Sequence, residues 1–266
     1  MINMNDVFSM LSTNQDTEIA GYGMSGDMKK TQYILELVGE PHDPDTLTCV
    51  LAAAEQGMEM DCYSISNMPT EQVAEGISKI SPFSITPCLR EADYIVCGWT
   101  AITEFINARG LGYSLSPQNA MLAAIQNYWV SVARQGIAQP VRQLIDELIN
   151  KKRTHENYLV GIETIDHIYK QLSAHFSLLD QQLENNKFIV CNKYTLADLH
   201  WTVYIHFCEL LGCEELISEC RNINKWYQSI KVRKSSCGQN LVAYDCLPTL
   251  EQMLLGELNV VRMSDF

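Results

Sequence analysis

The sequence lacks the features that mark membrane-spanning, secreted and nucleic-acid-binding proteins. No apolar run reaches the roughly 18 residues that a membrane-spanning helix needs, and the first residues, MINMNDVFSMLSTNQDTE, lack the basic start and apolar stretch of a signal peptide. Basic side chains are also scarce: 19 Lys and Arg stand against 32 Asp and Glu, and the net charge of -13 repels nucleic-acid phosphates and anionic lipid headgroups. We therefore expect a soluble, cytoplasmic protein whose partners include neither nucleic acid nor membrane.

Closely spaced cysteines are absent too, although the chain has 10 cysteines in all. No C-x-x-C pair occurs and no Cys and His stand at zinc-finger spacing, so the sequence indicates neither a metal site nor a dithiol redox motif. Glycine (14) and proline (8) are few and 47% of the 266 residues are apolar, which excludes a disordered chain or a small disulfide-stapled scaffold. We expect a well-packed protein with mostly buried, reduced thiols and no bound metal.

The first part of the chain predicts strands that alternate with helices. Residues 1–30 are polar and show no hydrophobic period, so we expect a flexible N-terminal extension there. The elements expected next are the strand QYILELV, a helix TLTCVLAAAEQG with Thr46 where its N-cap belongs, the strand MEMDCYSI, the helix TEQVAEGISKI, the strands ITPCL and DYIVC, and a helix over residues 99–108. This order, βαβαββα over residues 31–110, predicts an α/β domain.

The second part of the chain predicts helices only. Pro117 stands near the start of a long helix that runs through NAMLAAIQNYWVSVARQ. Further on, apolar residues recur at spacings of three and four, as in a helical bundle: Ile162, Ile165, Tyr169, Leu172, Phe176, Leu179 and Leu183. We expect an all-α helical bundle domain over residues 115–236 and a C-terminal tail over residues 237–266.

One helix start carries a specific capping pattern. In the segment FIVCNKYTLADLHWTVYIHFCELLG, Thr195 is expected as the N-cap and Asp198 as the third helical residue, an arrangement close to a capping box. The helix that follows is apolar on nearly all faces, so we expect it to be buried. Because a buried helix end needs its own cap, we assign Thr195 and Asp198 a structural role.

The order of these features resembles the cytosolic glutathione S-transferase superfamily. The run Thr195-Leu196-Ala197-Asp198 matches the S/T-x-A-D capping motif of that superfamily, RNINKWYQSIKVRKS resembles the stretch that follows it, and SPFSITPCL resembles the NPxGxVPxL of its N-terminal domain. The resemblance covers about residues 31–236 and is nearest to the bacterial dehalogenase and maleylacetoacetate-isomerase-like members. It implies a thioredoxin-like domain followed by a helical domain, a homodimer, and a cis peptide bond before Pro87 that displays the backbone of Thr86 to the cysteinyl part of glutathione.

The residues that would activate the glutathione thiol depart from the family's pattern. The family places a Tyr, Ser or Cys just after the first strand, whereas the matching turn here reads His42-Asp43-Pro44-Asp45-Thr46, with Asp43 at the usual Ser or Cys position. A carboxylate beside a thiolate raises the thiol pKa, which opposes activation. Thr46 remains a possible donor and His42 a possible base, although helix capping and solvent exposure explain these two residues as well.

The contacts to the rest of glutathione depart from the pattern as well. The family's E/D-S-x-A-I, which binds the γ-glutamyl end, is replaced by Gly98-Trp99-Thr100-Ala101-Ile102, without the carboxylate and the small hydroxyl. Trp99 is either a stacking wall for another ligand or a core residue. Across the cleft, Tyr128, Trp129 and Arg134 suit a flat or anionic organic ligand, and one of the two aromatics is expected in the core because adjacent helical residues do not share a face.

Three functions are consistent with this sequence. The leading expectation is a divergent glutathione S-transferase-like enzyme that acts on a small organic substrate by thiol transfer, dehalogenation or isomerisation, with weak or altered use of glutathione. The second is a non-catalytic binding or assembly protein that keeps the fold, and the third is a site for a ligand without a thiol, with His42 and Asp43 as an acid/base pair. An open cleft with convergent polar groups favours an enzyme, whereas a cleft filled by Trp99 favours a binding protein.

Overall fold

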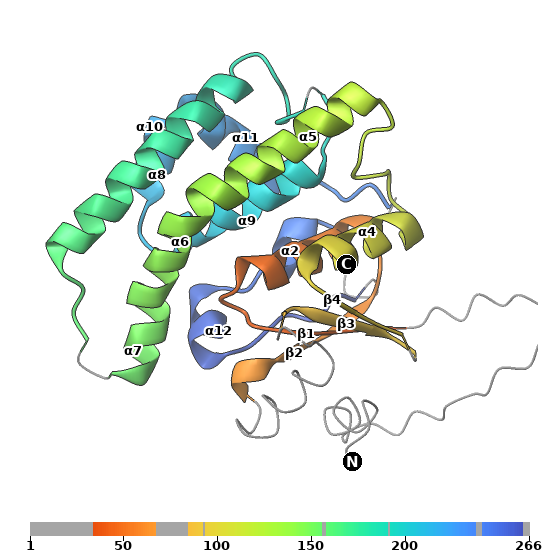
Figure 1. Ribbon diagram of the computed structural model, residues 1–266, viewed down its shortest axis with the longest axis horizontal. Helices are drawn as coiled ribbons and strands as arrows, with labels where there is room; N and C mark the ends of the chain where they lie inside the picture. The colour runs from red at the N-terminus through yellow and green to blue at the C-terminus, as the bar shows by residue number, and fades with distance from the viewer. Residues whose placement is uncertain are drawn as a thin grey trace, which may run out of the picture.

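The computed structural model describes residues 34–67, 85–92, 94–155, 158–190, 192–237 and 241–262. The expected N-terminal extension over residues 1–30 and the expected helix TEQVAEGISKI lie outside the described residues. The described chain forms a small sheet with helices on one of its faces and a larger group of helices packed beyond them (Figure 1). This is the thioredoxin-like domain plus helical domain that the resemblance implies, and the expected fold class is confirmed.

The sheet is mixed, with the strand order β2-β1-β3-β4. Strand β1 (Leu35–Gly39) pairs in parallel with β2 (Met60–Ser64) and antiparallel with β3 (Cys88–Glu91), which in turn pairs antiparallel with β4 (Tyr94–Cys97). The Thr86–Pro87 peptide bond is cis, as expected, and it immediately precedes β3. A parallel pair followed by an antiparallel hairpin is the arrangement that βαβαββα order predicts.

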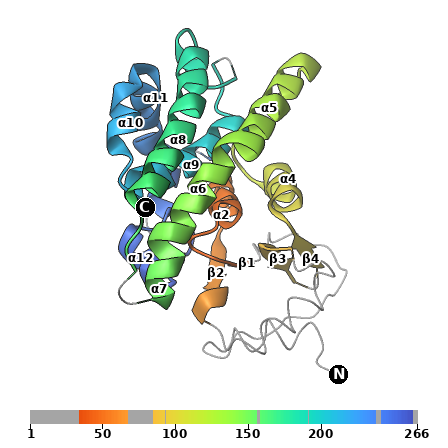
Figure 2. The same cartoon turned by 60° about the vertical axis from the view of Figure 1, so that its left-hand side comes forward.

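Two helices, α2 (Pro44–Gln56) and α4 (Trp99–Arg109), cover the face of the sheet that is turned toward the helical domain (Figure 2). Helix α2 is buried along almost its whole length and ends as expected at Gly57, whose φ of 65° is the left-handed conformation that glycine adopts most easily. The N-cap that we predicted for this helix is wrong. Asp43, not Thr46, is the N-cap, because Pro44 takes the first helical position, where its missing N–H has no partner to lose.

The long helix expected through NAMLAAIQNYWVSVARQ is longer than the sequence predicts. It starts at Ala120, capped by Asn119, and continues without a break through α5 (Ala120–Val132), the π turn η2 (Ala133–Ile137), α6 (Ala138–Ile145), the π turn η3 (Asp146–Asn150) and α7 (Lys151–Thr154). The first π turn precedes Pro140, which lacks the N–H of a regular helical hydrogen bond. The chain therefore widens the helix locally instead of ending it.

The remaining helices build the bundle. They are α8 (Ile162–Leu183), α9 (Leu196–Leu210), α10 (Glu214–Glu219) and α11 (Arg221–Lys231). The apolar stripe of α8 is buried from Ile168 to Leu183 and includes Phe176, but Ile162 at its first turn is 80% exposed and does not belong to the core. Helix α9 is buried nearly all round, and the Thr195–Asp198 capping box is present, as expected.

The segment assigned as the C-terminal tail packs against the first domain. It carries the short 3-10 helix η4 (Ala243–Cys246) and α12 (Leu250–Leu255), and Val261 pairs with Met60 at the outer edge of β2. A second 3-10 helix, η1 (Ile65–Asn67), follows β2. Of the helices that the structure describes, none is long and apolar enough to cross a membrane. The described residues likewise contain no cluster of His, Cys, Asp or Glu side chains that would hold a metal ion.

Candidate functional site

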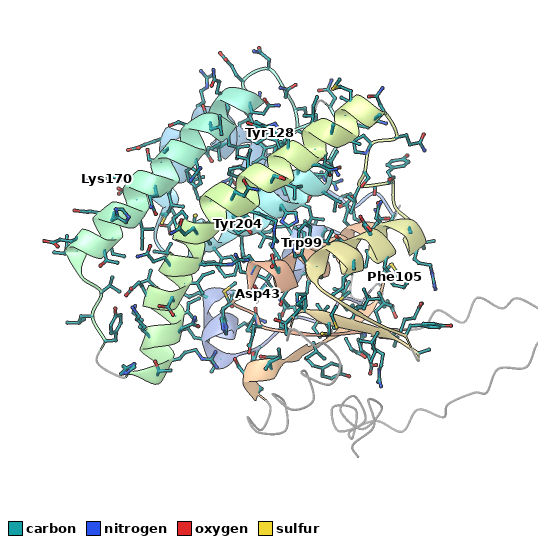
Figure 3. All side chains as sticks on the ribbon, viewed as in Figure 1. Asp43, Trp99, Phe105, Tyr128, Lys170 and Tyr204 are labelled. Atoms are coloured by element: carbon teal, nitrogen blue, oxygen red, sulfur yellow. The ribbon has the colours of Figure 1, made fainter. Side chains whose placement is uncertain are left out.

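The first turns of α2 and α4 face the helical domain, and most of the expected site residues lie at this junction. Figure 3 shows Asp43, Trp99 and Tyr204 near one another between α2, α4 and α9, whereas Tyr128 lies farther along α5. Helices α2 and α9 are in contact, as are α5 and α9. The junction therefore brings residues of both domains together, which is a common place for a small-molecule site.

Asp43 and Thr46 bind each other at the start of α2. One oxygen of the Asp43 carboxylate accepts hydrogen bonds from the backbone N–H of Thr46 (3.0 Å) and from its hydroxyl (2.8 Å). The Thr46 hydroxyl in turn accepts from the backbone N–H of Glu40 (3.2 Å). The hydroxyl proton of Thr46 is thus committed to Asp43, while burial and the neighbouring Asp45 raise the pKa of the Asp43 carboxyl.

His42, the residue before Asp43, lies close to Glu40. Its Nδ1 is buried without a hydrogen-bond partner among the described residues and lies 4.0 Å from a carboxylate oxygen of Glu40. Burial lowers the pKa of the ring, which the Glu40 charge counteracts in part. The described residues show no hydrogen bond between His42 and Asp43, so the acid/base pair considered above has no support in the geometry.

The cis-proline turn lies next to the start of α4. The carbonyl of Pro87 accepts from the N–H of Gly98 (2.8 Å), which ties the start of β3 to the start of α4. Thr86 is half-buried, and its backbone makes no hydrogen bond to another described residue. Gly98 itself has φ 89°, a conformation that L side chains rarely adopt. The glutamate of the family's motif would therefore be strained at this position.

Trp99 lies between two side chains of the helical domain. The ring of His200 meets it edge to face, with centroids 4.2 Å apart and planes at 83°. The guanidinium carbon of Arg134 lies 4.6 Å from the indole centroid, within the range of a cation–π contact. Trp99 is accordingly half-buried and bridges the two domains.

Ion pairs between Asp45 of the first domain and two arginines of the helical domain also join the domains. The Arg134 guanidinium donates to Asp45 in the first turn of α2 (2.8 Å), and Arg142 approaches the second oxygen of the same carboxylate (3.4 Å). The Asp45 side chain is only 14% exposed, so water screens these charges incompletely. Arg134, expected as a ligand-binding residue, is thus held by Asp45 and Trp99.

His200 and Tyr204 bring unpaired polar atoms to the junction. They stand one turn apart on α9, and both ring nitrogens of His200 and the hydroxyl of Tyr204 are buried without a hydrogen-bond partner in the described residues. Burial and the Arg134 charge lower the pKa of His200 to about 3, so the ring is neutral at physiological pH. Burial also raises the pKa of Tyr204, and the hydroxyl keeps its proton. Buried polar groups without protein partners commonly bind water or a ligand.

The structure separates the two aromatics expected on α5. Trp129 is 5% exposed and belongs to the core, where its carbonyl accepts from the indole N–H of Trp201 (3.2 Å). Tyr128 is 58% exposed. Our sequence analysis missed Asp45, His200 and Tyr204. The signal was present for the last two, because a His and a Tyr four residues apart on a helix that is otherwise apolar all round must be buried with it.

Known proteins with similar sequences are mostly glutathione S-transferases. A family model described as the glutathione S-transferase C-terminal domain matches residues 145–235. Among curated relatives, glutathione S-transferase F4 of Arabidopsis thaliana is 22% identical over 224 residues, which are 80% of this chain and 89% of that protein. Tetrachloro-p-hydroquinone reductive dehalogenase of Sphingobium chlorophenolicum is 32% identical over 81 residues, or 30% of this chain and 33% of that protein.

Solved structures show the same fold along most of the chain. A glutathione S-transferase from Rhodospirillum rubrum F11 superimposes with a TM-score of 0.70 at 16% identity, covering 88% of this chain and all of that one. The family-model match lies in the helical domain, and the curated relatives and the solved structure extend the similarity through the thioredoxin-like domain. The chain is therefore similar to glutathione S-transferases over most of its length and has their fold, and residues 145–235 match their C-terminal domain.

Proposed function

We propose that this protein is a glutathione S-transferase-like enzyme that acts on a small organic substrate and binds glutathione weakly. The observation that carries the proposal is the junction itself: the side chains that serve glutathione in the family are replaced or occupied, while buried polar atoms of His200 and Tyr204 have no hydrogen-bond partner among the described residues. The His200 ring lies against Trp99. Convergent polar groups inside an apolar surrounding are typical of a small-molecule site. Transfer, dehalogenation and isomerisation all remain open as the reaction.

Weak use of glutathione follows from the start of α2. At the position where the family supplies a hydroxyl or thiol, Asp43 carries a carboxylate, and the nearby hydroxyl of Thr46 already donates to it. A thiolate placed here meets the Asp43 carboxylate, and the Thr46 hydroxyl is already committed to that carboxylate, so the thiol pKa rises. Binding of the γ-glutamyl end is expected to be weak as well. The indole of Trp99 takes the place of a small hydroxyl and packs against His200 and Arg134.

Binding calorimetry tests the glutathione part of the proposal. Two unmade charge-assisted contacts weaken binding by about 1.5–3 kcal/mol each, so we expect a millimolar or weaker dissociation constant for the wild type. Trp99→Ser, which restores the small hydroxyl, is expected to tighten binding about tenfold, and Leu159→Ser, which changes a residue that is 90% exposed, is the control. Micromolar binding by the wild type contradicts the proposal.

Turnover tests the enzyme part. Tyr204→Phe removes only the unpaired hydroxyl, so it should preserve the fold and lower turnover of a bound electrophile, by roughly tenfold or more if that hydroxyl contacts the reacting group. A panel of small halogenated and unsaturated acids and quinones, with and without added glutathione, provides the substrates. Rapid glutathione conjugation of chlorodinitrobenzene with micromolar saturation would show that the thiol site is intact.

A non-catalytic binding protein is the second candidate, and the position of Trp99 favours it. The indole is held by an edge-to-face contact and a cation–π contact, so it occupies space at the junction of the domains. Under this alternative, Trp99→Ala opens the junction without creating or abolishing any turnover. A loss of turnover in Tyr204→Phe with unchanged thermal stability distinguishes the enzyme from the binding protein.

A further inference from the structure

Two cysteines that are nine residues apart in the sequence lie face to face in the hairpin of β3 and β4. Cys88 and Cys97 are direct partners in the antiparallel register, and their sulfur atoms are 2.8 Å apart. A disulfide bond is about 2.05 Å long, so the sulfurs need to approach by less than about 1 Å. The absence of a C-x-x-C motif had indicated no dithiol pair, and the hairpin creates one that the spacing does not show.

The register also places the two backbones at a suitable distance. The N–H of Gly98 donates to the carbonyl of Pro87, which makes these two residues a hydrogen-bonded pair of the ladder. Because hydrogen-bonded and non-hydrogen-bonded pairs alternate, the next pair, Cys88 and Cys97, is of the non-hydrogen-bonded type. Such pairs have Cα atoms about 4.5 Å apart, within the range of about 4.4–6.8 Å that disulfides span.

We propose that Cys88 and Cys97 are a redox site that a hydroperoxide oxidises to a reversible cross-strand disulfide. The sulfur of Cys97, as thiolate, attacks the peroxide: an S–O bond forms, the O–O bond breaks, and the alcohol or water leaves with a proton. The sulfur of Cys88 then attacks the resulting sulfenic acid, so the S–S bond forms, the S–O bond breaks, and water leaves with the Cys88 proton. Two thiols lose two electrons in total and one hydroperoxide gains them.

The two thiols differ in exposure and in pKa, and they therefore have different roles in this reaction. Cys97 is half-buried and within reach of a small oxidant, whereas Cys88 is only 2% exposed. The Cys88 thiol donates to Cys97, which lowers the pKa of Cys97 and raises that of Cys88. Cys97 is therefore the attacking sulfur and Cys88 the resolving one. Cys49 and Cys62, by contrast, have pKa values raised by burial and nearby carboxylates.

Peptide mapping tests this proposal directly. Trypsin cleaves after Arg90, between the two cysteines, so the disulfide links peptides 80–90 and 91–109, each of which contains one cysteine. The full-length reduced protein is treated with hydrogen peroxide, its remaining thiols are alkylated under denaturing conditions, and the digest is analysed without reductant. We expect the linked pair, lighter by two hydrogen atoms than the sum of the free peptides, and its loss after treatment with dithiothreitol.

Matched variants separate this pair from the other thiols. Cys88→Ser is expected to leave a sulfenic acid on Cys97 that dimedone traps, and Cys97→Ser to abolish both the link and the trapped product. Cys213→Ser removes a thiol of another close pair, Cys208 and Cys213, and should leave the link intact. The proposal is overturned if both peptides of the folded wild type stay fully alkylated after peroxide, or if the same link forms only in protein unfolded before oxidation.

Discussion

The two buried histidines of α9 differ in their partners. His206 forms hydrogen bonds with the hydroxyl of Tyr244 (2.8 Å) and the carbonyl of Pro248 (3.0 Å), whereas His200 has no hydrogen-bond partner in the described part of the chain. Burial lowers the pKa of His206 to about 4 and, with the Arg134 charge, that of His200 to about 3. Both rings are therefore neutral in the folded protein and gain protons when it unfolds below pH 6.5.

This difference predicts how His200→Leu changes the acid sensitivity of the fold. The unfolded chain takes up the His200 proton first, so the free energy of unfolding falls as the pH drops from 6.5 toward 3, by up to about 1.4 kcal/mol per pH unit. Leucine removes that contribution without breaking a hydrogen bond. We expect unchanged or higher stability at pH 7.5 and a flatter acid limb in urea titrations measured at several pH values.

His206→Leu is the matched control for this experiment. It also removes a titrating ring, but it leaves the Tyr244 hydroxyl without its ring partner. We expect it to lose about 1–2 kcal/mol at pH 7.5. If His200→Leu loses as much at that pH, His200 has a hydrogen-bond partner in solution.

The start of α9 shows how much one element depends on a single carboxylate. Asp198 accepts hydrogen bonds from the backbone N–H groups of Ile189 (2.9 Å) and Thr195 (3.0 Å) and from the indole N–H of Trp226 (3.0 Å). It thus fixes the helix start, the segment before it and α11 together. Burial raises its pKa to about 6 in spite of these donors.

We predict unequal costs for removing the two capping residues. Thr195→Ala should lower the free energy of unfolding by about 1–2 kcal/mol, and Asp198→Ala by about 3–5 kcal/mol because it leaves several buried donors unpaired. Asp180→Ala is the control, since Asp180 caps α11 at a half-buried site where water can replace it, and about 1 kcal/mol is expected. Equal denaturant midpoints for Asp198→Ala and Asp180→Ala contradict this account.

At the scale of helices and strands, the sequence predicts the features that depend only on residues close together in the chain. The capping box at Thr195 and Asp198 and the helix end at Gly57 are local patterns, and both are found in the structure. The start of α2 was missed because Asp43-Pro44-Asp45-Thr46 offers two capping residues, and only the preference of proline for the first helical position chooses between them. The Cys88–Cys97 contact and the orientation of His200 depend on strand register and domain packing, which no local pattern encodes.

At the scale of the whole molecule, several exposed apolar side chains follow one another in the segment from the end of α4 to the first turn of α5. Leu111 and Tyr113 follow α4 and Met121 lies in the first turn of α5, and these three side chains are 61%, 83% and 68% exposed. Leu159 and Ile162, which are 90% and 80% exposed, lie at the start of α8, away from the start of α5 (Figure 1). Large apolar side chains left exposed on one segment can mark a protein–protein interface.

We predict a homodimer whose interface includes the surface of Leu111, Tyr113 and Met121. A two-fold pairing is the commonest form of oligomer and buries the same patch on both chains, so one pair of substitutions acts twice. Light scattering at micromolar concentration should give about twice the chain mass of 30.1 kDa for the wild type and for the control Leu159→Glu. The double variant Tyr113→Asp, Met121→Glu should give the mass of one chain with an unchanged circular dichroism spectrum, because it places four carboxylates in the paired patch. A single-chain mass for the wild type refutes the dimer, and a dimeric double variant moves the interface elsewhere.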